Sequence, residues 1–137
     1  MNEDPIRILH LEDDDLDAEL IAYTMGYAGL RVTVERVEER SGFIAALEKG
    51  GFELILSDSS LPAFTGTEAL ELAKRLRPEV PFVFVSGSMG ETFVTESLQR
   101  GAREYVLKGA LALLGPTVER IIGEIRGKPG PSRDDGR

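Results

Sequence analysis

The sequence predicts an α/β fold in which one sheet of five parallel strands is covered by helices. Two observations support this prediction: the pattern of apolar residues and the length of the chain. Short apolar runs with the composition of strands alternate with longer amphipathic stretches along the whole chain. Such alternation is typical of parallel strands joined by right-handed helical crossovers, with helices on both faces of the sheet. The length of 137 residues is enough for one domain with a substantial core.

Five apolar segments are the candidate strands. The second, residues 32–37, alternates apolar and polar residues, as a strand with one wetter face does. The third, residues 54–57, is compact and mostly apolar, which is typical of a central strand. The others are residues 6–11, 82–85 and 105–107. With a helix after each strand, this order predicts a flavodoxin-like, doubly wound sheet with strand order 2-1-3-4-5 and five helices.

Five stretches with apolar residues at helical spacing follow these strands. The first runs over residues 16–25 and stops at the glycines that follow, and Ser41 is a candidate cap for the second. The last has Pro116 near its first turn. The third and fourth have the spacing of a capping box, at Thr65 with Glu68 and at Ser88 with Glu91.

Composition and charge exclude several classes of protein. The chain has 16 basic and 24 acidic residues, and its net charge of -8 disfavours binding to a phosphate backbone. It has no apolar run near the roughly 20 residues that span a bilayer, no signal-like start and no cysteine. We therefore expect a cytoplasmic protein with no membrane insertion. Residues 1–126 are the predicted domain, and residues 127–137, rich in Pro and Gly, are a predicted disordered tail or linker stub.

Polar residues follow four of the predicted strands at the edge where ligands bind in such sheets. Glu12 and Asp13 follow the first strand, and Asp58 follows the third. Ser86 follows the fourth strand, and Lys108 follows the fifth. Clustered carboxylates repel one another unless a cation neutralises them, and a purely oxygen ligand set favours Mg²⁺. An Asp beside Mg²⁺ and a Lys is a plausible nucleophile toward phosphorus, which makes the site a candidate phosphoryl acceptor.

These segments resemble the receiver domains of two-component response regulators. The resemblance covers roughly residues 5 to 126 and includes Pro62 four positions after Asp58 and Gly66 eight positions after it. The phrases Leu-Glu-Asp-Asp and Leu-Ser-Asp-x-x-Leu-Pro are similar to receivers that accompany sensor histidine kinases. The matching segments are Ile-Leu-His-Leu-Glu-Asp-Asp at 8–14, Leu-Ile-Leu-Ser-Asp-Ser-Ser-Leu-Pro at 54–62, Phe-Val-Ser-Gly at 84–87 and Tyr-Val-Leu-Lys at 105–108.

The resemblance implies a role for each site residue. Asp58 would accept a phosphoryl group from a phosphohistidine on a sensor histidine kinase or phosphotransfer protein. Mg²⁺ would be held by Glu12, Asp13, Asp58 and the backbone carbonyl of Ser60. Ser86 would be the switch hydroxyl, Lys108 would bind the phosphoryl group, and Tyr105 would be the switch aromatic. A downstream protein partner, or a second copy in a homodimer, would use the face formed by the fourth helix, fifth strand and fifth helix.

Some residues depart from the pattern or have a plainer interpretation. Gly109 stands where the family often has a cis proline, and Ser86 replaces the commoner Thr. Ser60 and Ser88 occupy positions that tune the lifetime of the acyl phosphate in this family. Asp14, Asp15 and Asp17 read as acids favoured at a helix N-terminus. His10, within an apolar strand, reads as a packed structural residue rather than a phosphoryl carrier.

Two other functions remain open from the sequence. A degenerate receiver would bind a partner without being phosphorylated. A phosphohydrolase with an Asp nucleophile, of the haloacid-dehalogenase type, would carry a second acid two residues after the nucleophile, where this chain has Ser60. A third function, that of an FMN-binding protein, is disfavoured. Such a protein would need small hydroxylated residues after the first strand, where this chain has acids. No independent substrate turnover is expected of a receiver beyond its own phosphorylation and dephosphorylation.

Overall fold

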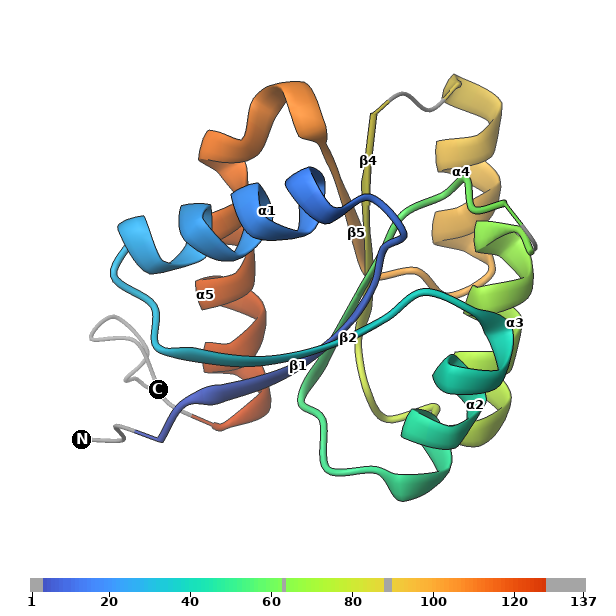
Figure 1. The fold of residues 1–137 in the computed structure, drawn as a ribbon, viewed down its shortest axis with the longest axis horizontal. Coiled ribbons are helices and arrows are strands. Elements are labelled where there is room, and N and C mark those ends of the chain that lie inside the picture. The colour runs from blue at the N-terminus through green and yellow to red at the C-terminus, as the bar shows by residue number, and fades with distance from the viewer. Residues whose placement is uncertain (1–3, 63, 88–89, 128–137) are drawn as a thin grey trace.

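The computed structural model describes residues 4–62, 64–87 and 90–127. Strands and helices alternate along the chain, as the sequence predicts (Figure 1). The elements are β1 (Ile6–Leu11), α1 (Asp15–Tyr27), β2 (Val32–Val37), α2 (Arg40–Lys49), β3 (Leu54–Ser57), α3 (Gly66–Leu76), β4 (Phe82–Ser86), α4 (Glu91–Gln99), β5 (Glu104–Leu107), the 3-10 helix η1 (Lys108–Leu113) and α5 (Leu114–Ile125).

The five strands form one parallel sheet in the order β2-β1-β3-β4-β5. This confirms the predicted flavodoxin-like topology. The central strands β3 and β4 are buried along their whole length, because helices cover both faces of the sheet. In the register of β1 with β3, Leu11 lies beside Ser57. The residues that follow these two strands therefore emerge next to one another.

Two layers of helices enclose the sheet (Figure 1). Helices α1 and α5 lie on one face, where Ile21 and Met25 of α1 pack with Val118 and Ile121 of α5. Helices α2, α3 and α4 lie on the other face, over a core that includes Phe43, Leu70 and Phe84. The part of the chain that the structure describes holds no helix long and apolar enough to cross a membrane.

The helix caps match the sequence prediction in one case out of three. Thr65 and Glu68 form the predicted capping box at the start of α3. The prediction that Ser41 caps α2 is wrong, because the helix already begins at Arg40 and Glu39 holds the cap position. Helix α4 begins at Glu91 with Gly90 as its cap, rather than with the predicted Ser88, which lies outside the described residues.

The connection from β5 to α5 differs from a simple strand-to-helix turn. Lys108 opens η1, which runs directly into α5, and Pro116 lies in the first turn of α5 as predicted. The peptide between Lys108 and Gly109 is trans, since the described residues include no cis peptide bond. The tail predicted for 127–137 lies outside the described residues except for Gly127.

Candidate functional site

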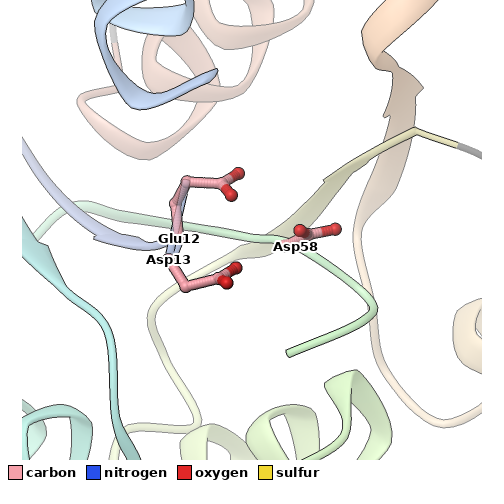
Figure 2. A group of neighbouring side chains, drawn as sticks. All are labelled: Glu12, Asp13 and Asp58. Carbon is pink, nitrogen blue, oxygen red and sulfur yellow. The ribbon is translucent and has the colours of Figure 1, made fainter. Parts of the chain in front are cut away.

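Three carboxylates meet at the carboxyl ends of β1 and β3. Glu12 and Asp13 follow β1, Asp58 follows β3, and one oxygen from each lies within 4.8 Å of the others (Figure 2). A hydrogen bond of 3.0 Å from the Asp58 amide to the Leu11 carbonyl ties the two strand ends together. The three acids predicted from the sequence therefore form one cluster, because their strands are neighbours in the sheet.

Asp58 is largely buried and its carboxylate is held in place by its neighbours. Its Oδ1 accepts a hydrogen bond of 2.8 Å from the Ser59 amide, and its Oδ2 lies 3.4 Å from Lys108 Nζ. The buried hydroxyl of Ser57 donates to the Asp58 carbonyl at 2.7 Å. Only 8% of Asp58 is exposed, so these contacts fix both its backbone and its side chain at the end of β3.

Glu12 is fully buried beside the other two acids. Its Oε2 accepts a hydrogen bond of 3.1 Å from the Asp14 amide, and its Oε1 lies 2.9 Å from Lys108 Nζ. Burial raises the pKa of Glu12, and the hydrogen bond from Lys108 opposes this change. A second cation, Arg36, donates from Nε to the Glu12 carbonyl at 2.9 Å. Glu12 therefore has a cation beside its carboxylate, Lys108, and another beside its backbone carbonyl, Arg36.

Lys108 brings its ammonium group into contact with three carboxylates. Its Nζ lies 2.6 Å from Asp17, 2.9 Å from Glu12 and 3.4 Å from Asp58. Burial alone would lower the pKa of Lys108, but the hydrogen bonds to Asp17 and Glu12 and the charge of Asp58 raise it above its usual value. Lys108 is therefore a permanent cation at this edge of the sheet, 50 residues from Asp58 in sequence.

Ser86 lies at the same edge, at the end of β4, and is almost fully buried. Its hydroxyl lies 2.5 Å from the hydroxyl of Ser59, so a hydrogen bond joins the ends of β4 and β3. Ser60 pairs with Thr65 in an isolated antiparallel bridge immediately after Asp58. The structure thus places Ser59, Ser60 and Ser86 around the loop that follows the cluster.

Two other predicted residues have contrasting environments. His10 is 1% exposed on β1, and burial, with the charges of Lys108 and Arg36, lowers its pKa to about 4. It is therefore a neutral, packed side chain, in agreement with its structural interpretation. Tyr105 is 42% exposed on β5, at the sheet edge away from β1. Tyr105 is therefore partly open to solvent, and it lines a groove beside β5 and α5.

Sequence reasoning missed two contacts of the site. Asp17 was interpreted only as an acid of a helix N-terminus, yet it is the closest partner of Lys108. Ser59 was given no role, although its amide and hydroxyl contact Asp58 and Ser86. The local sequence around Asp17 held no signal for this contact, because its partner Lys108 lies 91 positions away.

The donor set of the site fits a hard divalent cation. The three clustered carboxylates supply only oxygen ligands, and the group that the described residues form contains no His and no Cys. One ammonium group faces three of the acids, so the pocket keeps a surplus of negative charge. Oxygen ligands with surplus negative charge are the arrangement that Mg²⁺ prefers in proteins.

Comparison with known proteins identifies the family of this chain. The family model of the response regulator receiver domain matches residues 8–112. The response regulator protein FleR of Pseudomonas aeruginosa is 25% identical over 132 residues, which cover 95% of this chain and 27% of that protein. The uncharacterized transcriptional regulatory protein YkoG of Bacillus subtilis is 30% identical over 87% of this chain and 49% of that protein.

Solved structures share the fold over most of the chain. A CheY-like receiver domain protein from Methanospirillum hungatei has a TM-score of 0.76 and 28% identity, covering 90% of this chain and 99% of that one. A receiver domain from Rhodospirillum rubrum has a TM-score of 0.73 and 22% identity, covering 84% and 94%. The chain spans no more than about half the length of FleR and YkoG. It belongs to the family of response regulator receiver domains of two-component signalling.

Proposed function

We propose that this receiver domain is a phosphoacceptor that takes a phosphoryl group onto Asp58 from a phosphohistidine of a sensor histidine kinase or phosphotransfer protein. The observation that carries the proposal is the convergence of Lys108 and the acids Glu12, Asp13 and Asp58 at one edge of the sheet. An isolated surface carboxylate would have no fixed cation such as Lys108 beside it, and no neighbouring acids that could hold a metal ion.

The transfer is an in-line displacement at phosphorus. An oxygen of the Asp58 carboxylate forms the new bond to phosphorus, and the bond from phosphorus to the imidazole nitrogen breaks. The electron pair of that bond stays on the imidazole of the donor. Lys108, whose ammonium already lies 3.4 Å from Asp58 Oδ2, stabilises the negative charge on the transferred group.

Mg²⁺ is the cation that we propose for the acidic cluster. Glu12, Asp13, Asp58 and the backbone carbonyl of Ser60 would hold it. When bound, it offsets charge on both the acids and the phosphoryl oxygens. The full burial of Glu12 supports this assignment, because a buried carboxylate needs positive charge close by.

Phosphorylation would be read out by a change in Ser86 and Tyr105. The hydroxyl of Ser86 would leave Ser59 and donate to a phosphoryl oxygen, and the exposed ring of Tyr105 would turn inward. The phosphoryl group can favour this second conformation only if it makes different contacts with the protein in the two conformations.

Beside Tyr105, a groove of about 440 Å³ lies between β5 and the start of α5, lined by residues that include Leu107 and Leu113. We infer that the downstream protein partner docks on this face.

The exposed side of α1 is the surface that we propose for the phosphodonor. Leu16, Leu20, Tyr23 and Tyr27 recur every three or four positions, so they form one stripe, and each is at least 50% exposed. The stripe begins beside the acidic cluster, since Leu16 is three residues from Asp13. A helical domain carrying a phosphohistidine can bury this stripe while its imidazole reaches Asp58.

Phosphorylation by a small donor tests the proposal without a kinase. Acetyl phosphate with Mg²⁺ should add one phosphoryl group to the wild-type chain, seen by mass spectrometry, and Asp58→Asn should remain unmodified. Omission of Mg²⁺ should abolish the reaction. Modification that persists in Asp58→Asn would refute the assignment of the acceptor.

The same experiment separates the two alternatives. A degenerate receiver would stay unmodified with acetyl phosphate and show no change with beryllofluoride. A phosphohydrolase would release inorganic phosphate steadily from many phosphoesters. The absence of an acid at Ser60, two residues after Asp58, disfavours the hydrolase.

A further inference from the structure

The closest partner of the Lys108 ammonium is an acid outside the carboxylate cluster. Asp17 Oδ2 lies 2.6 Å from Lys108 Nζ, whereas Glu12 and Asp58 lie at 2.9 Å and 3.4 Å. The side chains are 16% exposed for Lys108 and 37% exposed for Asp17, so the pair is partly shielded from water. Shielding of this kind strengthens the attraction between the two charges.

Asp17 is held in a fixed position by the start of α1. The side chain of Asp14 caps this helix and accepts a hydrogen bond of 2.9 Å from the Asp17 amide. The Asp17 carboxylate is therefore attached to a backbone that is itself anchored beside the cluster. The contact joins the first turn of α1 to the first residue of η1, which lies 91 positions later in the sequence.

We propose that Asp17 is a positioning residue, which holds the Lys108 ammonium where it can contact a phosphoryl group on Asp58. This inference rests on the proposed function of Asp58. An ammonium has three N–H donors, and Lys108 has three carboxylate partners. Phosphorylation would alter Asp58, and the proposed cation would be held by Glu12. Asp17 is the partner of Lys108 that takes part in neither event, so it holds the ammonium group in place throughout the reaction.

The plainer alternative is that Asp17 acts only as an acid that stabilises the N-terminus of α1. Asp15 provides a matched control for this role. It lies in the same first turn, its side chain is 81% exposed, and it pairs with Arg36 at 2.7 Å rather than with Lys108. The variants Asp17→Asn and Asp15→Asn each remove one negative charge from the same helix end.

The first test compares rates of phosphorylation by acetyl phosphate at saturating Mg²⁺. Asp17→Asn should lower the saturating rate constant about tenfold, the effect of losing one hydrogen bond between charged groups. Asp15→Asn should stay within about twofold, because exposed charges at a helix end have small effects. Equal losses in the two variants, or no loss in Asp17→Asn, would overturn the proposal.

A double-mutant cycle shows whether Asp17 acts through Lys108. In a Lys108→Ala background, Asp17→Asn should cause no further loss of rate, because the group that it positions is gone. The same loss in both backgrounds would overturn the proposal. So would a loss of Mg²⁺ affinity, measured by calorimetry, as large as that of Asp13→Asn, because Asp17 would then be a metal ligand.

A signal from Lys108 itself distinguishes failure of this inference from failure of the proposed function. In the NMR spectrum of the full chain, the Lys108 ammonium protons should be protected from exchange with water in the wild type and in Asp15→Asn, and should exchange faster in Asp17→Asn. Unchanged exchange in Asp17→Asn would refute the positioning role whether or not Asp58 is phosphorylated. Modification that persists in Asp58→Asn would refute the acceptor assignment, while the exchange rates would still show whether Asp17 holds the Lys108 ammonium.

Discussion

The hydroxyl oxygens of Ser59 and Ser86 lie 2.5 Å apart, and this hydrogen bond joins the loop after β3 to the end of β4. Ser86 is the proposed switch hydroxyl, and Ser59 is the hydrogen-bond partner of that hydroxyl in the structure. A hydroxyl has one proton to donate. If that proton goes to Ser59, the bond must break or reverse before Ser86 can donate to a phosphoryl oxygen.

Replacement of Ser59 should therefore make the switch easier. Ser59→Ala removes the hydrogen-bond partner of Ser86, and this bond is worth about 1 kcal/mol, or about fivefold in an equilibrium constant. We expect beryllofluoride, a mimic of the phosphoryl group, to bind Ser59→Ala about fivefold more tightly than the wild type. Titration followed by NMR measures this affinity.

Ser86→Ala is the matched control for this prediction. It removes the same hydrogen bond to Ser59 but also the hydroxyl that would contact the phosphoryl group. We expect its beryllofluoride affinity to fall rather than rise. If both variants bind more weakly, the contact between Ser59 and Ser86 supports the activated state, and the prediction is wrong.

Gly66 should tolerate no side chain, because the loop after Asp58 passes directly over it. A Cβ at this position would lie 2.8 Å from Ser59 Cα and 2.8 Å from Phe84 Cε1. Ser59 belongs to the backbone that orients Asp58, so relief of the clash would displace the site. We expect Gly66→Ala to lower the free energy of unfolding by about 2 kcal/mol in urea denaturation and to slow phosphorylation.

Gly26→Ala is the control for Gly66→Ala. Gly26 lies within α1, and a Cβ there would meet nothing within 4 Å. An alanine in a helix is more favourable than a glycine, so this variant should gain about 0.5 to 1 kcal/mol of stability. A Gly66→Ala variant as stable as the wild type would show that the loop can move without cost.

The fold was predictable from the sequence because short apolar runs alternate with helical stretches along the whole chain. The run at β3 is mostly apolar, which favours a buried strand, and Gly50 and Gly51 end the preceding helix α2 by a local signal. The grouping of Glu12, Asp13, Asp58 and Lys108 was also predictable, because parallel strands deliver their carboxyl ends to one edge.

Contacts that depend on side-chain direction were not predictable in this way. Asp17 has two suitable roles, at a helix N-terminus and as a partner of Lys108, and local sequence indicates only the first. Ser41 is a good cap by type, yet α2 begins one residue earlier, at Arg40. In both cases the position is decided by tertiary packing, which local preference does not encode.

Kinase-dependent phosphorylation should be lost when the apolar stripe of α1 is made polar, while small-donor phosphorylation should persist. Leu20→Ser and Tyr23→Ser remove exposed side chains that do not contact Asp58, so the folded state and its chemistry should be unaffected. With a histidine kinase that phosphorylates the wild-type chain, we expect the rate of transfer to fall at least about tenfold.

The control for the stripe is Ile125→Ser, which removes an exposed apolar residue at the end of α5. It should leave both reactions unchanged. Equal losses with the kinase and with acetyl phosphate in Tyr23→Ser would mean that α1 supports the chemistry rather than docking. Unchanged kinase transfer would remove α1 from the proposed docking surface.

The pair of Arg126 with Glu53 should make stability depend on acid conditions. Arg126 Nη2 and Nε lie 2.7 Å and 2.8 Å from the two Glu53 oxygens, so the pair is bidentate, and it joins the end of α5 to the residue before β3. The hydrogen bond from Arg126 lowers the pKa of Glu53. A lowered pKa means that the stabilisation is present above the pKa of the unfolded chain, near 4.5, and is lost as the pH falls through the folded value.

Glu53→Gln should therefore be less stable than the wild type at neutral pH, by about 1 to 3 kcal/mol, and the difference should shrink below about pH 4.5. Urea denaturation across this pH range measures the difference. The control is Glu35→Gln, which breaks an ion pair with Lys49 at the same distance of 2.7 Å, but between side chains that are both more exposed. Water screens that pair, so its loss should change stability by less than about 0.5 kcal/mol. If the two variants lost the same stability at every pH, burial and bidentate geometry would not be what gives the Arg126 pair its strength.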